Sequence, residues 1–215
     1  LAKPFTVKEL DRRLSRILGR KRALQSVYWC IEKKHFPKAL SEVELFLSKP
    51  KNSEFFPLAL KIKGEILQSC GHYPQAKVFY QAILNVQKFT WAQLGLVKTF
   101  LHLNEDEAAE KLVLRLAFKP ESQLAAYDLL MSLQIKHGDF DTALECVLMA
   151  SEISPRNIRR HKTVLDLSRI THDYHTQFEA AKKIVKFAKN SIHDMPEHYL
   201  NVARAGIDYA MTSDD

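Results

Sequence analysis

Hydrophobic residues recur along the chain with the spacing of α-helices. In the segment 57–69 the apolar side chains are Leu60, Ile62, Ile66 and Leu67, and the segments that follow it show a similar period near 3.6 residues. No segment alternates apolar and polar residues as a half-buried strand does. The pattern therefore predicts an all-α fold.

A five-residue phrase returns between these helical segments. Its clear copies are His35-Phe36-Pro37-Lys38-Ala39, His72-Tyr73-Pro74-Gln75-Ala76 and Asp139-Phe140-Asp141-Thr142-Ala143, with a degenerate copy at Asn104-Glu105-Asp106-Glu107-Ala108. The intervals predict stacked helix-turn-helix units with a period in the mid-thirties. We expect Gly71 and Gly138 to end the first helix of their units. The aromatic residue should lie between the two helices, and the alanine should face the core.

The phrase and its surroundings resemble the tetratricopeptide (TPR) repeat. The matching residues are Leu60, Gly64, Leu67, Ala76, Tyr80 and Ile83 in 57–90, then Trp91, Leu94, Gly95, Ala108 and Pro120 in 88–121, and Tyr127, Leu130, Gly138, Ala143, Ala150 and Pro155 in 124–157. Weaker matches cover 20–51 and 158–193. The resemblance implies an α-α superhelix of about five units over residues 20–215, with a capping helix over 195–215. The alternative is a plain helical bundle in which the phrase recurs by chance.

A TPR resemblance also implies a partner-binding groove lined by the first helix of each repeat. The positions carried over to this chain are Tyr28, Lys61, Glu65, Phe89, Leu96, Phe100, Asp128 and Lys162. Apolar residues at the centre and charges at the ends suit an amphipathic helix or an extended peptide. The alternative for each aromatic residue is packing against a neighbouring helix. Because acidic Glu65 follows Lys61, we do not expect a clamp for a C-terminal carboxylate.

The first eighteen residues do not fit the repeat. Lys3-Pro4-Phe5 stands before an amphipathic segment whose apolar face is Leu10, Leu14 and Ile17. Thr6 is a candidate N-cap, and Glu9 stands where a capping box needs an acidic residue.

This start resembles the end of a response-regulator receiver domain, in which a Lys-Pro pair closes the last strand and an amphipathic helix follows. The resemblance implies that residues 1–19 are the tail of a receiver, as in Vie-type regulators that join a receiver to TPR repeats. Lys3 would then be the lysine that contacts the phosphoryl group, in the full-length protein only. The alternative is an ordinary basic N-terminus.

Together these resemblances predict a protein-binding output module of a bacterial two-component system. The expected partner is a sensor kinase or another regulator, and we expect neither a cofactor nor enzyme activity. The three scattered cysteines, Cys30, Cys70 and Cys146, favour packed thiols in a reducing compartment, which points to the cytoplasm. No segment has the length of apolar chain that a membrane span needs.

Charge leaves two other functions open. Residues 1–51 hold 13 Lys and Arg against 5 Asp and Glu, whereas residues 52–215 hold 19 against 20. The basic cluster Arg12, Arg13 and Arg16 permits nucleic-acid binding, although a solvated helix face explains it more simply. Exposed apolar helices at the ends of a stack permit a homodimer.

Histidines provide the remaining candidate chemistry. His172 and His175, and His193 and His198, stand close in sequence, but no cysteine or carboxylate set completes a metal site beside them. We expect solvated histidines in corner loops, and no catalytic motif is present.

Overall fold

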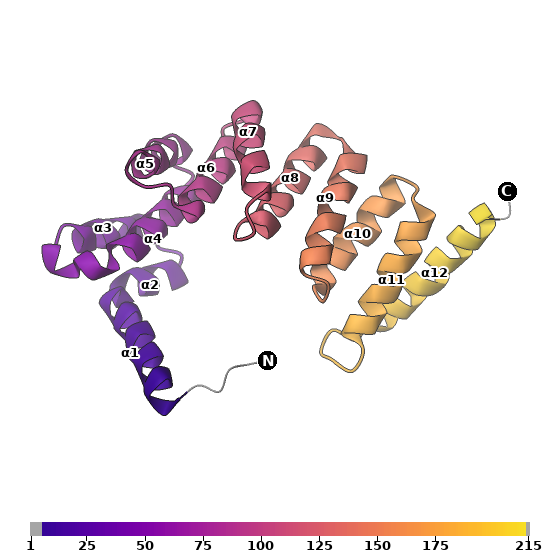
Figure 1. The fold of residues 1–215 in the computed structure, drawn as a ribbon, viewed down its shortest axis with the longest axis horizontal. Coiled ribbons are helices and arrows are strands. Elements are labelled where there is room, and N and C mark those ends of the chain that lie inside the picture. Colours follow the sequence, from indigo (N-terminus) through magenta and orange to yellow (C-terminus); the bar gives the residue numbers. More distant parts are fainter. Residues whose placement is uncertain (1–5, 214–215) are drawn as a thin grey trace. The chain divides into compact units, whose positions relative to one another are not determined.

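The computed structural model describes residues 6–213 (Figure 1). Within this range the chain forms helices and no β-strand, which confirms the predicted all-α class. The chain divides into two compact units, Leu1–Leu103 (unit 1) and Asn104–Asp215 (unit 2). Each unit is described by itself below.

Unit 1 contains six α-helices and one 3-10 helix within its described part. They are α1 (Val7–Ala23), α2 (Gln25–Glu32), α3 (Phe36–Leu47), η1 (Pro50–Phe55), α4 (Phe56–Ser69), α5 (Tyr73–Val86) and α6 (Thr90–His102). Unit 2 follows with α7 (Asp106–Ala117), α8 (Gln123–His137), α9 (Phe140–Ile153), α10 (Ile158–Ile170), α11 (Tyr174–Ala188) and α12 (Pro196–Ser213). In unit 2 each helix packs against the next one along the chain, as Figure 1 shows.

Left-handed backbone marks the corner of every repeat. The corner residues, with their φ angles, are Lys34 (57°), Gly71 (73°), Asn104 (57°), Gly138 (78°) and His172 (57°), so the successive intervals are 37, 33, 34 and 34 residues. Each corner separates a first helix (α2, α4, α6, α8 or α10) from a second helix (α3, α5, α7, α9 or α11). This regularity confirms five helix-turn-helix units and the helix-ending role predicted for Gly71 and Gly138.

The corners also correct two assignments of the phrase. Ala39, Ala76 and Ala143 are buried as predicted, but in the degenerate copy Ala109 is buried instead of Ala108. That copy therefore begins at Glu105, one residue later than expected. Asn104 adopts the left-handed backbone conformation that Gly71 and Gly138 adopt before the other copies. A further copy, not recognised in the sequence, begins at Asp173 and places buried Gln177 at the alanine position.

The core of unit 1 includes a tyrosine held between two glycines. Tyr80 in α5 is buried, and a Cβ atom added to Gly64 in α4 or to Gly95 in α6 would lie 2.6 Å or 2.4 Å from the ring carbon Cζ of this tyrosine. A side chain at either glycine would therefore require the Tyr80 ring to move. Val78, on the same helix, is exposed.

Residues around α1 differ from the rest of unit 1. None of the α1 side chains is buried, whereas Leu24, directly after the helix, is fully buried in the unit-1 core. The predicted domain boundary after residue 19 lies inside α1, which continues without a break to Ala23. Leu24 alone separates α1 from α2, the first helix of the first repeat.

Candidate protein-binding surfaces

In unit 1 the predicted groove residues fall into an exposed set and a buried set. Lys61 and Glu65 are exposed on α4, with their charged groups 3.9 Å apart, and Tyr28 on α2 is half-buried. These three side chains are available to a partner. An exposed ion pair of this kind contributes little to stability.

Leu96 and Phe100 were predicted at the centre of the groove, and the structure corrects that expectation. They are only 6% and 8% exposed, because α6 packs against both α4 and α5 and its apolar side chains form part of the core. Phe89 is half-buried directly before α6, where its ring stacks on Trp91 with centroids 5.5 Å apart. The aromatic residues of this region therefore serve packing first.

A buried polar link joins α4 to α6 beside these residues. The side-chain amide of Gln68 donates to the backbone carbonyl of Gly95 at 2.8 Å and to the hydroxyl of Thr99 at 2.9 Å. Thr99 is fully buried and donates in turn to the same carbonyl. Satisfied polar networks of this type fix the register of neighbouring helices.

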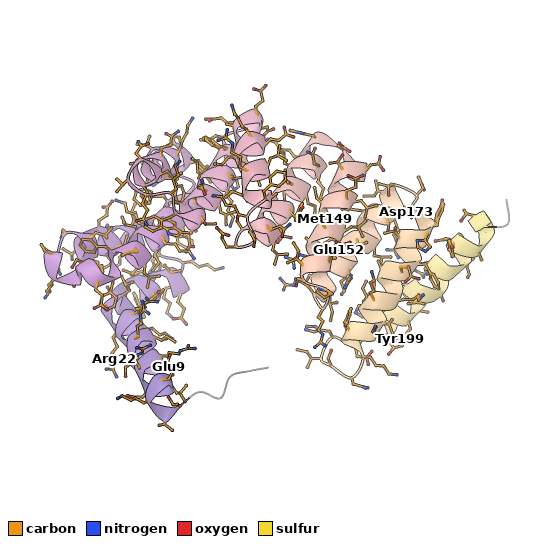
Figure 2. All side chains as sticks on the ribbon, in the orientation of Figure 1. Glu9, Arg22, Met149, Glu152, Asp173 and Tyr199 are labelled. Carbon is orange, nitrogen blue, oxygen red and sulfur yellow. The ribbon has the colours of Figure 1, made fainter. Side chains whose placement is uncertain are left out.

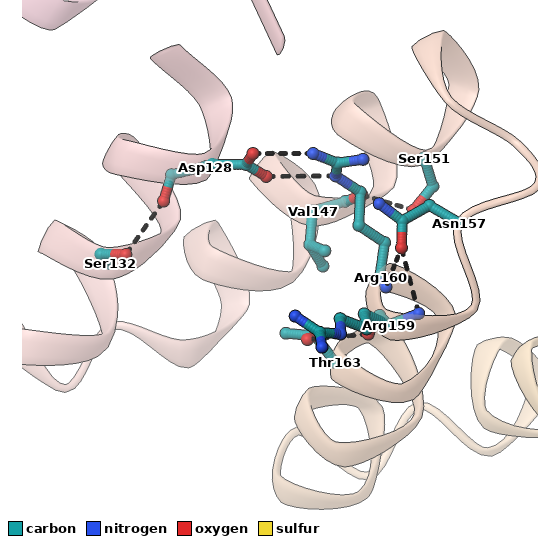
Figure 3. Close-up of polar contacts among 8 residues, drawn as sticks. All are labelled: Asp128, Ser132, Val147, Ser151, Asn157, Arg159, Arg160 and Thr163. Carbon is teal, nitrogen blue, oxygen red and sulfur yellow. Dashed lines mark hydrogen bonds and ion pairs between the residues drawn. The ribbon is translucent and has the colours of Figure 1, made fainter. Parts of the chain in front are cut away.

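In unit 2 the predicted groove residue Asp128 is engaged by an arginine of the next first helix. Nε and Nη2 of Arg160 donate to the two carboxylate oxygens of Asp128 at 3.1 Å and 2.7 Å (Figure 3). The arginine side chain is mostly buried and the aspartate partly exposed. Bidentate pairing is the strongest form of such a contact, so Asp128 acts in the first place as a link between α8 and α10.

Lys162 lines a pocket in unit 2. A pocket of about 220 Å³ is lined by Lys162, Leu165, Asp166 and Arg169 from α10, Ile184 from α11, and Glu197, His198 and Asn201 from α12. Arg169 donates to the side-chain oxygen of Asn201 at 3.0 Å. His198 is 5% exposed, and its Nε2 has no hydrogen-bond partner among the described residues. The expectation of a solvated histidine is therefore wrong for His198.

The other histidine pair lies where the sequence predicted it. His172 occupies the exposed corner between α10 and α11, and His175 is exposed as the second residue of α11. Within residues 6–213 no group of three His, Cys, Asp or Glu side chains is arranged to hold a metal ion. Cys30 and Cys146 are buried and Cys70 is half-buried, all without a disulfide, and burial raises the pKa of the Cys70 and Cys146 thiols.

The N-terminal helix presents an unpartnered apolar face. Leu10, Leu14 and Ile17, which we call the α1 stripe, are 49%, 48% and 58% exposed and lie on one face of α1. Glu9 and Arg22 mark the two ends of the helix in Figure 2. Lys3 lies outside the described residues.

Half of the predicted capping box is present at the start of α1. The Thr6 hydroxyl accepts a hydrogen bond from the Glu9 backbone N–H at 3.2 Å. The Glu9 carboxylate instead contacts Arg13 at 2.8 Å and Arg12 at 3.3 Å. The hydrogen bond from Arg13, with the nearby charge of Arg12, lowers the pKa of Glu9. Two of the three arginines of the basic cluster are thus partly neutralised by Glu9.

The fold defined by these repeats is that of TPR proteins. Solved structures with this fold include MamA (residues 41 to the end) from Desulfovibrio magneticus RS-1, with a TM-score of 0.59, 16% identity, and coverage of 80% of this chain and 97% of that one. TTC0263, a TPR protein of Thermus thermophilus, gives a TM-score of 0.60 at 12% identity, with coverage of 87% and 99%.

A third similar structure is YrrB, described as a TPR protein with an unusual peptide-binding site. Its TM-score is 0.52 at 14% identity, with coverage of 86% of this chain and 90% of that one. No protein-family model and no curated protein sequence matches the chain. At these identities the likeness establishes the fold alone. Among the described helices, none combines the length and apolarity that crossing a membrane requires.

Proposed function

We propose that this chain is a non-catalytic protein-binding module, the TPR output region of a cytoplasmic two-component response regulator. The observation that carries the proposal is the exposed α1 stripe on a helix that is separated by Leu24 alone from α2, the first helix of the first repeat. In a receiver domain the last helix buries such a face against the sheet. A receiver packed on Leu10, Leu14 and Ile17 would cover apolar surface that is otherwise in contact with water.

The expected partner is a protein, either a sensor kinase or another regulator. Exposed charges on the first helices, Lys61 and Glu65 in unit 1 and Lys162 in unit 2, offer polar contacts, and pockets lie on the same helices. Phosphorylation of the receiver would alter its contacts with α1 and so the position or order of the first repeat. Lys3 would sense the phosphoryl group, as the receiver resemblance implies.

Hydrogen exchange in α1 tests the receiver proposal. Exchange in the full-length protein is compared with exchange in the 215-residue chain. The full-length protein is then measured with and without a phosphoryl mimic such as beryllofluoride. We expect slower exchange over Val7–Ala23 in the full-length protein and a further change with the mimic. The variant Leu14→Asp should abolish the difference, whereas Leu45→Asp, at an equally exposed position of α3, should not. Identical exchange of α1 in all states would contradict the proposal.

Nucleic-acid binding is the less favoured alternative. It needs the basic cluster of α1, and Glu9 already contacts Arg12 and Arg13. It predicts binding that weakens steeply with added salt and is lost when Arg12, Arg13 and Arg16 are replaced. Salt titration with labelled DNA and RNA duplexes measures both effects.

A further inference from the structure

A pocket at the N-terminal end of unit 1 is lined by α1 and by the first helices of the first two repeats. Its volume is about 610 Å³, and its lining residues are Ile17, Arg20 and Lys21 from α1, Tyr28, Ile31 and Glu32 from α2, and Leu58 from α4. The size lies within the range of pockets that bind ligands or anchor side chains. Tyr28 is one of the groove positions predicted from the sequence, so the pocket lies where the repeat resemblance places partner contacts.

The floor of this pocket is apolar and firmly supported. Tyr28, Ile31 and Leu58 are half-buried and pack against the buried cluster of unit 1, which includes Val27 and Ile62. Side chains fixed in this way lose little freedom when a partner binds, which lowers the cost of binding. A preformed apolar floor suits a large hydrophobic side chain and offers nothing to a phosphate backbone.

The rim is basic. Arg20 and Lys21 contribute two positive charges against the single carboxylate of Glu32, and no described acidic side chain forms an ion pair with either cation. The remainder of α1 adds five more basic side chains (Lys8, Arg12, Arg13, Arg16 and Arg22) and two acidic ones (Glu9 and Asp11). A second copy of this helix would bring the same positive charge to the pocket, which argues against self-association here.

We propose that this pocket binds an acidic amphipathic helix of a partner protein. One large apolar residue of that helix would enter between α1, α2 and α4, and Asp or Glu residues one turn away would contact Arg20 and Lys21. Helix-in-groove recognition with apolar anchors and complementary rim charges is a general mode of peptide binding. The inference rests on the protein-binding role proposed above and does not depend on the receiver.

A selection from random peptides tests the chemistry of the occupant. A display library of random peptides, each about four helical turns long, is selected on the immobilised 215-residue chain, and the most enriched peptides are synthesised with a fluorescent label. We expect enriched sequences with net negative charge and a large apolar residue flanked by Asp or Glu at helical spacing. Binding, measured by fluorescence anisotropy, should weaken at least about tenfold when salt is raised from about 50 mM to about 500 mM.

Two variants locate the binding. The double charge reversal Arg20→Glu with Lys21→Glu should weaken binding at least about tenfold. The matched control Lys88→Glu with Lys98→Glu, at exposed positions elsewhere in unit 1, should leave it within about twofold. Tyr28→Ala should weaken binding because it removes part of the apolar floor of the pocket. Circular dichroism checks that this variant keeps its helix content. Ile17 is avoided because it also belongs to the α1 stripe.

Several outcomes would overturn the inference. They are the enrichment of basic or uncharged peptides, equal binding by the Arg20/Lys21 variant and the control, no enrichment at all, and a dimer of the chain whose formation Arg20→Glu with Lys21→Glu abolishes. Peptides that lose affinity for a Lys162→Glu variant instead would also overturn it, while leaving the protein-binding role proposed above intact. The receiver proposal is decided separately by hydrogen exchange in α1.

Discussion

The two corners of unit 1 and the last two corners of unit 2 begin their second helices in different ways. In unit 1, α3 and α5 follow His35 and His72, whose side chains make no cap hydrogen bond, and each helix has a proline in its first turn. In unit 2, α9 and α11 follow Asp139 and Asp173, whose carboxylates accept from the backbone N–H of Thr142 at 3.1 Å and of Thr176 at 2.9 Å.

Both arrangements address the unpaired N–H groups at a helix start. A proline removes one of these donors and presets its own φ angle, whereas an aspartate supplies an acceptor for one of them. The two solutions differ in their chemistry, because only the aspartate depends on ionisation. The comparison shows that one repeat geometry can be specified by unlike residues at the same position.

The cores of the two units differ in a related way. Positions can be counted from the corner glycines Gly71 in unit 1 and Gly138 in unit 2. Nine residues after the corner stand Tyr80 in unit 1 and Val147 in unit 2, and seven residues before it stand Gly64 and Met131. Tyr80 and Val147 are buried, and Met131 packs against the cluster that contains Val147. A large residue is thus matched with a small one in each repeat, in opposite order.

The largest effect is expected where unit 1 is packed most tightly. Gly95→Ala or Gly64→Ala should destabilise the protein by about 1–3 kcal/mol, because the new methyl group overlaps the buried Tyr80 ring. Urea unfolding followed by circular dichroism measures the loss. Gly206→Ala, whose methyl group would meet Phe178 at 3.2 Å, serves as the control with a smaller cost. Equal stability of the Gly95 variant and the wild type would show that the ring can move aside.

Removing a cap from unit 2 should have the next largest effect. Asp173→Ala deletes the acceptor for the Thr176 N–H and should cost about 1 kcal/mol. Asp173→Asn retains an acceptor and should lose only a small part of this. The two variants are compared in urea unfolding at neutral pH. A loss in the asparagine variant as large as in the alanine variant would assign the effect to charge instead of capping.

Transferring the cap to unit 1 should have a smaller effect of opposite sign. His72→Asp places a carboxylate within one turn of the Gln75 N–H and should stabilise the protein by about 0.5–1 kcal/mol. His72→Ala provides the reference. If the aspartate gives no gain over alanine in the midpoint of urea unfolding, the proline-containing corner does not accept this cap.

The smallest effect concerns pH. The Thr142 N–H lowers the pKa of Asp139 below its ordinary value of 3.8. Because the folded-state pKa is the lower one, this stabilisation is complete well above pH 3.8 and is lost as the pH falls through the folded value. Asp139→Asn keeps the acceptor and removes this dependence. The stability difference between wild type and variant should therefore shrink between about pH 5 and about pH 2.5, and a constant difference would contradict the assignment.

Much of the repeat could be predicted from local signals. Gly71 and Gly138 revealed two corners because glycine favours the left-handed backbone. Lys34 and His172 adopt the same backbone without being glycine, so their residue type did not indicate the left-handed position. The fifth copy of the phrase, which begins at Asp173, was not recognised because Gln177 stands where the other copies have alanine.

The binding surface was harder to predict, because exposure depends on neighbouring helices. Leu96 and Phe100 stand at groove positions of the repeat, yet α4 and α5 cover them. Arg160, which pairs with Asp128, was not identified as a site residue because its partner lies 32 positions away. Ile31 and Leu58 fit a helical pattern whether they face the core or a pocket.

The sequence by itself determined the helical class, the approximate period and the amphipathic nature of α1, since each depends on residues a few positions apart. The tertiary structure alone decided which apolar side chains stay exposed, that Tyr80 is enclosed by Gly64 and Gly95, and that α1 shares a pocket with α2 and α4. Those features depend on how helices distant in sequence pack, and a periodic pattern does not specify which neighbour covers a given face.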